Sequence, residues 1–278
     1  MKRPIFFLVA LCALTLFLGT PGTVRAFYMS TENDAILNKN TPQEFRFTED
    51  DVVEYDRATK TANFHWEWTG ATENIDALHL LPGDEILFSN DDAFHLGGSD
   101  FNDEDVIQYN RSTGTASVFL YCSDVYEGTS EHIDAFSIYN GLYYISTTTS
   151  AELDHPIGSL TSAEEGDLAV YNPSTGESWV MEIFGSAAEN IDAVHVLGDD
   201  DIILSTTSFA TLGGLSFDED DLVRYNPSTG QATPYFDGAS AFSLQEDIDA
   251  VYVPLPGAIW LLGSGLVALL GMRRKAYS

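Results

Sequence analysis

The sequence predicts an all-β fold, a four-bladed β-propeller built from four-stranded blades. Three observations support this prediction. An Ile-Asp-Ala triplet recurs at a nearly constant spacing, each interval between triplets carries the signals of short strands, and the strands left over at the two ends of the array make up one further unit. The body of the 278-residue chain is therefore a repeat array.

The four triplets set the period of the array. Their aspartates lie 58, 58 and 57 residues apart, at Asp76, Asp134, Asp192 and Asp249. Between triplets come a second apolar run, an acidic segment, a run of alternating apolar and polar residues, and a tight turn. These turns end in glycine at Gly114, Gly176 and Gly230, and each is followed by a last strand. Period-two alternation between turn signals indicates four short antiparallel strands in each unit.

The ends of the array predict that it closes into a ring. Before Ile75 we expect the second, third and fourth strands of a unit, at Asp34–Asn38, Asp51–Asp56 and Ala62–Trp66. After the last unit only a first strand remains, Ile248–Val253. A linear array would leave open sheet edges at both ends, whereas pairing of the last strand with the first sheet removes them. A five-bladed ring has no residues left for its fifth blade, and a β-sandwich would not produce so regular a period.

The amino-terminal residues 1–26 have the features of a secretory signal peptide. Lys2 and Arg3 precede an apolar stretch from Ile5 to Leu18, and Val24-Arg25-Ala26 resembles a small-residue cleavage site. The sequence thus predicts export, with the propeller domain spanning residues 27–253.

The carboxyl-terminal residues 254–278 form a second address segment. The motif Val253-Pro254-Leu255-Pro256 precedes an uncharged apolar stretch at 257–272, which we expect to form a helix, and the basic cluster Arg273-Arg274-Lys275. This order resembles the PEP-CTERM sorting signal in its VPLP variant. The resemblance implies recognition by an exosortase in the inner membrane of a Gram-negative bacterium and a destination at the cell surface or in the extracellular matrix. It implies membrane contact only through the tail, before processing.

Charge excludes one class of partner. The chain has 12 Lys and Arg against 43 Asp and Glu, a net charge of −31. Six of the basic residues and no acid lie in the two address segments, so the body carries −37. Such a surface repels phosphate backbones and excludes nucleic-acid binding. It attracts divalent cations.

The four repeated aspartates are the leading candidate site. In a propeller the first strand of each blade lines the central channel, so Asp76, Asp134, Asp192 and Asp249 are expected at one height around the axis. Four converging carboxylates repel one another, and a Ca²⁺ ion with oxygen ligands would relieve that repulsion. Four-bladed propellers of the hemopexin type hold ions in this channel, and the resemblance implies the same here. The alternative is that each aspartate accepts backbone N–H bonds and joins one blade to the next.

Other repeated or isolated polar residues are weaker candidates. Three residues after each aspartate the chain has His79, Ser137, His195 and Tyr252, a set too mixed for a transition-metal site. The acidic segments before each third strand do not match the spacing of a calcium-binding loop, and we expect them to form a solvated rim; the alternative is weak Ca²⁺ binding in the extracellular millimolar range. Cys122 is the one cysteine outside the signal peptide, so the body has no intramolecular disulfide.

No catalytic motif stands out in the sequence. The chain has no nucleophile elbow, no zinc-protease motif and no phosphate-binding glycine loop. The largest departure from the repeat is the 149–165 segment of the third unit, which carries four extra residues. The body resembles propeller-type repeats of exported bacterial proteins of unknown activity, and its Tyr-Asn-Pro-Ser-Thr-Gly hairpins resemble kelch-type turns, a likeness of fold only.

The sequence therefore favours a non-enzymatic surface or matrix interaction protein that binds extracellular polysaccharide or another surface protein. The association of PEP-CTERM signals with exopolysaccharide producers implies the polysaccharide partner. The alternative is a secreted glycosidase or lyase with a carboxylate pair 5–10 Å apart in one off-axis pocket.

Overall fold

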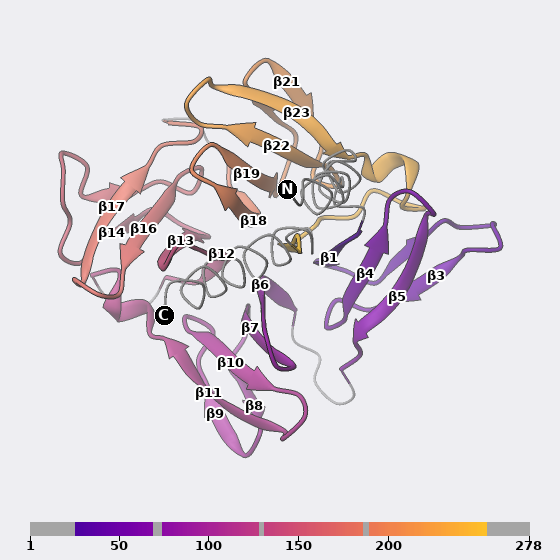
Figure 1. The fold of residues 1–278 in the computed structure, drawn as a ribbon, viewed down its shortest axis with the longest axis horizontal. Coiled ribbons are helices and arrows are strands. Elements are labelled where there is room, and N and C mark those ends of the chain that lie inside the picture. Colours follow the sequence, from indigo (N-terminus) through magenta and orange to yellow (C-terminus); the bar gives the residue numbers. More distant parts are fainter. Residues whose placement is uncertain (1–25, 69–73, 128–130, 186–188, 255–278) are drawn as a thin grey trace, which may run out of the picture. The chain divides into compact units, whose positions relative to one another are not determined.

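A computed structural model describes residues 26–68, 74–127, 131–185 and 189–254. Ala26–Val253 form one compact unit, in which four antiparallel four-stranded sheets are arranged in a ring (Figure 1). This is the four-bladed β-propeller that the sequence predicts. The predicted signal peptide, up to residue 25, and the tail from residue 255 onward lie outside the described residues.

Each blade has the same strand order from the centre of the ring outward. Blade one consists of β24 (Ala250–Tyr252), β1 (Ala26–Ser30), β4 (Val52–Asp56) and β5 (Thr61–Trp66). Blade two consists of β6 (Ile75–Leu81), β7 (Glu85–Asn90), β10 (Val106–Asn110) and β11 (Thr115–Leu120). Blade three consists of β12 (Ile133–Tyr139), β13 (Leu142–Thr147), β16 (Leu168–Asn172) and β17 (Glu177–Met181). Blade four consists of β18 (Ile191–Gly198), β19 (Asp201–Thr206), β22 (Leu222–Asn226) and β23 (Gln231–Phe236).

A small hairpin between the second and third strands of every blade was not predicted. The four hairpins are β2 (Ala35–Leu37) with β3 (Phe45–Phe47), β8 (Phe94–Leu96) with β9 (Ser99–Phe101), β14 (Ala151–Glu152) with β15 (Ser162–Ala163), and β20 (Ala210–Leu212) with β21 (Leu215–Phe217). Short 3₁₀ turns, η1 (Cys122–Asp124) and η2 (Gly238–Ser240), follow the outer strands of blades two and four. The repeat is thus a four-stranded meander with one inserted hairpin.

The ring closes as the sequence predicts, by pairing of the last strand with the first. In the antiparallel register, Met29 lies opposite Val251 and Ser30 opposite Ala250. One detail of the prediction was wrong: the second strand of blade one is Ala26–Ser30, not Asp34–Asn38, which falls in the hairpin β2–β3. Phe27 and Met29 are fully buried, so the alternation that marks this strand starts where the signal peptide was expected to end.

The hydrophobic core lies between blades. One buried cluster joins blades one and two, a second joins two and three, and a third joins three and four. At the seam between blades four and one, the rings of Phe27 and Tyr55 contact Phe236 at centroid distances of 5.2 and 5.4 Å. Because each blade buries its faces against two neighbours, no blade completes a core alone.

Backbone hydrogen bonds also join the blades. The N–H of the triplet isoleucine donates to a carbonyl in the acidic segment of the preceding blade: Ile75 to Glu49, Ile191 to Glu165, and Ile248 to Glu219 across the closing seam. The closing seam therefore uses the same bond as two of the other three seams.

Two seams carry an additional arginine contact. Arg57 donates to the carbonyl oxygen of Tyr235 at 2.5 Å and lies over the Tyr235 ring, and Arg111 donates to the carbonyl of His65 at 2.6 Å. The equivalent positions in blades three and four are Pro173 and Pro227, which cannot make this contact.

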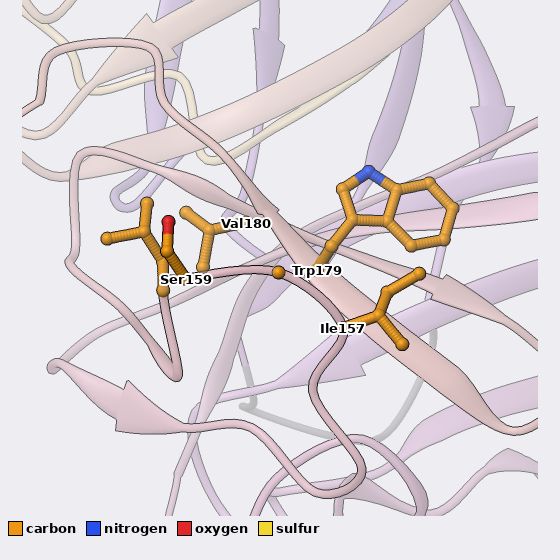
Figure 2. A pocket seen from close by; sticks show the side chains of 6 residues that line it. Ile157, Ser159, Trp179 and Val180 are labelled. Carbon is orange, nitrogen blue, oxygen red and sulfur yellow. The ribbon is translucent and has the colours of Figure 1, made fainter.

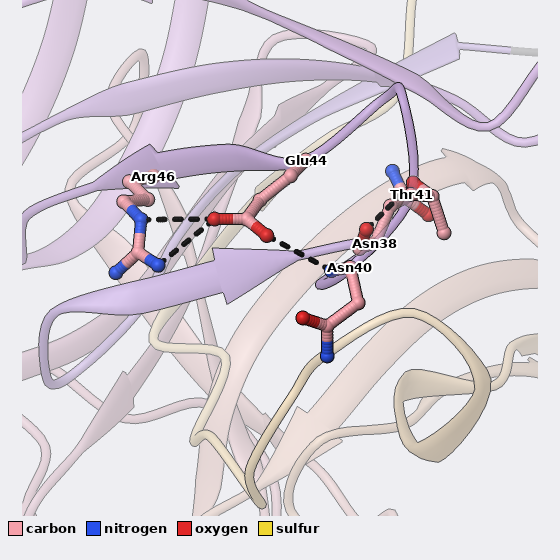
Figure 3. A network of polar contacts seen from close by, with 5 residues as sticks. All are labelled: Asn38, Asn40, Thr41, Glu44 and Arg46. Carbon is pink, nitrogen blue, oxygen red and sulfur yellow. Dashed lines mark hydrogen bonds and ion pairs between the residues drawn. The ribbon is translucent and has the colours of Figure 1, made fainter.

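The turns of the hairpins are stabilised in different ways. In blade one, Glu44 accepts hydrogen bonds from the Asn40 backbone N–H and the Arg46 guanidinium, and the Thr41 hydroxyl donates to the carbonyl of Asn38 (Figure 3). Blades two and four use a Gly-Gly turn instead. Gly97 of blade two has φ +59°, and an added Cβ would lie 2.7 Å from the backbone nitrogen of Ala116.

This close approach distinguishes two adjacent glycines. Gly97→Ala and Gly98→Ala both place alanine at positive φ, which costs about 1–2 kcal/mol. Only Gly97→Ala also forces β11 away, because nothing lies within 4 Å of a Cβ at Gly98. We expect Gly97→Ala to lower the free energy of unfolding by about 1–3 kcal/mol more than Gly98→Ala, measured by urea denaturation. Equal losses in the two variants would contradict the packing of this hairpin on β11.

Candidate axial site

The four triplet aspartates converge on one central pocket, as the sequence predicts. Asp76, Asp134 and Asp192 each sit at a β-bulge, where the pairing register between the first and second strands skips one residue. A bulge redirects the side chain of the extra residue, so the flanking isoleucine and alanine stay buried while the aspartate faces the pocket. Asp249 directly precedes β24. All four aspartates are between 4 and 7% exposed.

A second ring of polar side chains lies two residues before the aspartates. Its members are Asn74, His132, Asn190 and Asp247. The Asn74 amide donates to the carboxylate of Asp249 in the preceding blade at 2.5 Å, and Asn190 likewise bonds Asp134. These contacts are made by side chains, not by the backbone N–H groups considered as the alternative role.

At the closing seam the second ring has no asparagine to bond the aspartate of the preceding blade. There the residue of the second ring is Asp247, and it faces Asp192 of blade four, with which it shares a hydrogen bond. An acid thus occupies the position where two other blades have an asparagine. Sequence reasoning overlooked this ring, although the residue before each triplet isoleucine was its signal.

A third ring follows the second strand of each blade. Its members are Glu32, Asp91, Thr148 and Thr207. The N–H groups of Glu32, Thr148 and Thr207 donate at 3.1 Å to the carbonyl oxygens of Asp247, His132 and Asn190. The three rings, with Asn33 and Glu49, line a pocket of about 480 Å³.

The pocket is rich in oxygen atoms that lack hydrogen-bond donors. Among the described residues, five such buried atoms belong to its lining: Asn74 Oδ1, Asp134 Oδ2, Asn190 Oδ1, Asp192 Oδ2 and Asp247 Oδ1. His132, the lining residue that could become cationic, has its Nε2 3.3 Å from a carboxylate oxygen of Asp103. Buried acceptors without partners are destabilising, so this arrangement is suited to a positively charged ligand.

Burial and mutual repulsion disfavour the ionised carboxylates. Desolvation raises the pKa of Asp134 and of Asp247 to about 7. The pKa values of Asp76, Asp192 and Asp249 are raised well above 3.8, first by desolvation and then by the neighbouring carboxylates. Only a cation would allow several of these groups to be ionised together at neutral pH.

One corner of the pocket has the dimensions of a cation site. Carboxylate oxygens of Asp192, Asp247 and Asp249 all lie within 4.8 Å of one another. Two oxygens on opposite sides of a Ca²⁺ ion, each at about 2.4 Å, are separated by about 4.8 Å, so the three groups can share one ion. The donor set contains only oxygen, which suits a hard cation such as Ca²⁺ better than a metal that prefers nitrogen or sulfur ligands. Asp76 and Asp134 line the same pocket but are not part of this group.

The histidine pair lies on the same inner strands, three residues beyond the aspartates. The rings of His79 and His195, from opposite blades, are stacked at 5.8 Å, and the Tyr252 ring lies 4.6 Å from that of His195. The fourth member, Ser137, accepts a hydrogen bond from the N–H of Val196 at 3.0 Å. Desolvation lowers the pKa of His79 to about 4 and that of His195 to about 3. These rings are neutral and pack against one another around the axis.

The acidic segments have a structural role that sequence reasoning did not foresee. One aspartate in each accepts a hydrogen bond from the backbone N–H just after the outer strand: Asp51 from Trp68, Asp105 from Cys122, Asp167 from Ile183, and Asp221 from Gly238. These bonds fix the end of each blade. Cys122 is buried, and burial raises the pKa of its thiol to about 12, so the thiol is unreactive.

The sorting motif is only partly within the described residues. Val253 is buried at the end of the closing strand and Pro254 follows it. Leu255, Pro256 and the basic residues Arg273, Arg274 and Lys275 lie outside the described residues, as does the expected apolar helix at 257–272. Within the described ranges there is no helix of the length and apolar character needed to cross a membrane.

Of the comparisons with known proteins, only the comparison with solved structures finds similar chains. No family model and no curated protein matches the sequence. Similar structures include the extracellular domains of a putative one-component system and a putative hybrid two-component system from B. thetaiotaomicron, both at 11% identity. They have TM-scores of 0.30 and 0.32 over 78% and 77% of this chain. The chain spans only 30% of their length, and similarity this low carries no functional conclusion.

The buried histidines predict a pH dependence of stability. An unfolded histidine has a pKa near 6.5, so between pH 6.5 and about 4 each of these two histidines binds more protons in the unfolded chain, and its contribution to stability falls as the pH falls. The buried aspartates, whose folded pKa values are raised, contribute to the slope of stability against pH with the opposite sign, so the histidine contribution is taken as the difference between variant and unmodified protein. Replacing His195 by glutamine should reduce this slope by about 1.4 kcal/mol per pH unit. Urea denaturation between pH 7 and 5 measures it. His155→Gln, at a side chain 76% exposed, serves as the control. An unchanged slope in the His195 variant would contradict a buried neutral ring.

Proposed function

We propose that the protein is an exported, non-enzymatic interaction protein whose propeller is stabilised by Ca²⁺ in the axial pocket. The observation that carries the cation part of the proposal is the group of Asp192, Asp247 and Asp249, surrounded by buried oxygens without donors. A cation compensates several unpartnered acceptors and several carboxylates at once.

The position of this group gives the ion a mechanical role. Asp192 lies on β18 of blade four, whereas Asp247 and Asp249 precede the three-residue closing strand β24 of blade one. An ion held by all three would link the two sides of the seam at which the ring closes. At the seam between blades one and two, the Asn74 amide donates a hydrogen bond to Asp249. At the seam between blades three and four, Asn190 bonds Asp134. The closing seam has an acid instead, which favours ion binding there.

Export and the kind of partner rest on the address segments and on the near-equivalence of the blades. The signal-like residues 1–26 and the PEP-CTERM-like tail support transfer across the inner membrane of a Gram-negative cell, processing by an exosortase, and a surface or matrix destination. The four aspartates lie around an axial pocket, whereas a glycosidase would use one off-axis carboxylate pair. This arrangement favours a binding scaffold for extracellular polysaccharide or a surface protein.

A single substitution can distinguish stabilisation by the cation from the stability of the cation-free fold. Asp247→Asn restores the amide found in two other blades, which should stabilise the cation-free protein because it removes one buried carboxylate beside Asp192. The same change should abolish most of the Ca²⁺ effect. For the unmodified chain, Ca²⁺ at 100 times its Kd adds about 2.7 kcal/mol, which raises the melting temperature by about 5–10 °C. Thermal melts in EDTA and in Ca²⁺ measure both effects.

The matched control also removes one carboxylate, but from the surface. The Asp100 side chain is 93% exposed, so Asp100→Asn should melt as the unmodified protein does in both conditions. If Ca²⁺ leaves the unmodified protein's melting curve unchanged, or stabilises the Asp247 variant equally, the proposed site is wrong.

The export proposal is tested in a Gram-negative host that contains an exosortase. Mass spectrometry of the protein recovered outside the inner membrane should show a chain that begins at Phe27 and lacks the apolar tail. Replacing Pro254 and Pro256 by alanine should leave the tail attached and the protein in the inner-membrane fraction. Normal processing of that variant would refute the role of the Val-Pro-Leu-Pro motif.

A further inference from the structure

Blade three departs from the symmetry of the ring at its hairpin. In blades two and four the hairpin strands are joined by a Gly-Gly turn, whereas in blade three nine residues, 153–161, separate β14 from β15. This connection runs along the outer strand β17. The N–H of Ile157 donates to the carbonyl of Ser178 at 2.8 Å, and the Ser178 hydroxyl donates to the carbonyl of Asp154 at 2.6 Å. The extra residues are thus held on the blade edge.

The attached segment forms a shallow apolar pocket of about 500 Å³ with β17. Its lining residues are Ile157, Gly158, Ser159, Leu160, Trp179 and Val180 (Figure 2). Ile157 is 44% and Leu160 41% exposed, two of the six large apolar residues most exposed among those described. Trp179 is half-buried, and it also packs against the hydrophobic core shared by blades three and four. Large apolar side chains exposed together around a hollow are typical of a docking site.

Charge limits what can occupy this pocket. No lysine or arginine occurs between Arg111 and Arg224, a stretch that includes all of blade three. Within three residues of the pocket lining in the sequence are Asp154, Glu177 and Glu182, and also His155, whose Nε2 lies 3.5 Å from a carboxylate oxygen of Asp154. An anionic ligand would be repelled, and a cationic one would be attracted over about 10 Å at moderate ionic strength.

We infer that this pocket docks a cationic polypeptide segment that inserts one aliphatic or aromatic side chain beside Trp179. The lining offers a single side-chain hydroxyl, that of Ser159, which does not match the many hydroxyl groups of a sugar ring. Ser178 already pairs with the 153–161 connection, so the occupant does not add a strand there. Its apolar side chain supplies affinity and its lysines or arginines supply attraction to the acidic blade.

Fluorescence anisotropy with a labelled pentapeptide, one leucine between two pairs of lysines, tests the inference on the full chain in Ca²⁺. Replacing that leucine by asparagine keeps the charge and should weaken binding at least tenfold, because the buried leucine is lost. Raising the salt from 50 to 500 mM should also weaken binding at least tenfold. A neutral oligosaccharide of the same length should not compete.

Two protein variants test whether the peptide binds in this pocket. Ile157→Ser with Leu160→Ser should weaken binding of the leucine peptide at least fivefold while leaving the weak binding of the asparagine peptide unchanged. Phe209→Ser, which removes an apolar side chain 61% exposed on blade four, should bind as the unmodified protein does. Melting curves confirm that the variants fold.

Three results would overturn the inference: equal binding of the two peptides, equal binding by the pocket variant and the Phe209 variant, or displacement by the oligosaccharide. The test does not depend on the axial ion. The Asp247 variant should bind the peptide normally, so failure of the calcium proposal and failure of this one are distinguishable.

Discussion

Closure of the ring through β24 and β1 is the contact on which the rest of the structure depends. The apolar clusters lie between blades, so every blade needs both neighbours to bury its faces. The closing contact is short, with Met29 opposite Val251 and Ser30 opposite Ala250, but it is reinforced from both sides. Ile248 bonds Glu219 of blade four, and Glu32 bonds the carbonyl of Asp247. With this seam closed, every blade packs against two neighbours.

The same closure creates an electrostatic problem at the axis. Bringing four inner strands together places Asp76, Asp134, Asp192 and Asp249 around one pocket, away from bulk water. Asparagine donors partly compensate at two seams. At the closing seam Asp247 adds a carboxylate beside Asp192, and desolvation, followed for Asp192 by the neighbouring carboxylates, raises the pKa values of both groups. The closing seam therefore concentrates buried carboxylates, which is the basis of the cation proposal.

Two of the departures from fourfold symmetry lie in different parts of the ring. One is polar and axial, at the junction of blades four and one; the other is apolar and peripheral, on blade three. Both arise from local changes to a repeat whose other polar residues have structural roles, such as Asp51, Asp105, Asp167 and Asp221 at the ends of the blades. The proposed cation site and the proposed docking pocket lie at these two departures.

The sequence by itself determined the number of blades, the closure and the convergence of the aspartates, because a fixed period and two incomplete ends leave one ring that satisfies every strand. It could not place the second strand of blade one: Ala26–Ser30 adjoins the signal segment, and Asp34–Asn38 has a similar pattern. Only the tertiary structure showed that Asp247 faces Asp192, that Asn74 serves Asp249 across a seam, and that the extra residues of blade three lie on β17. These contacts join residues that are far apart in the chain, and their geometry is fixed by the register and bulges of strands in neighbouring blades.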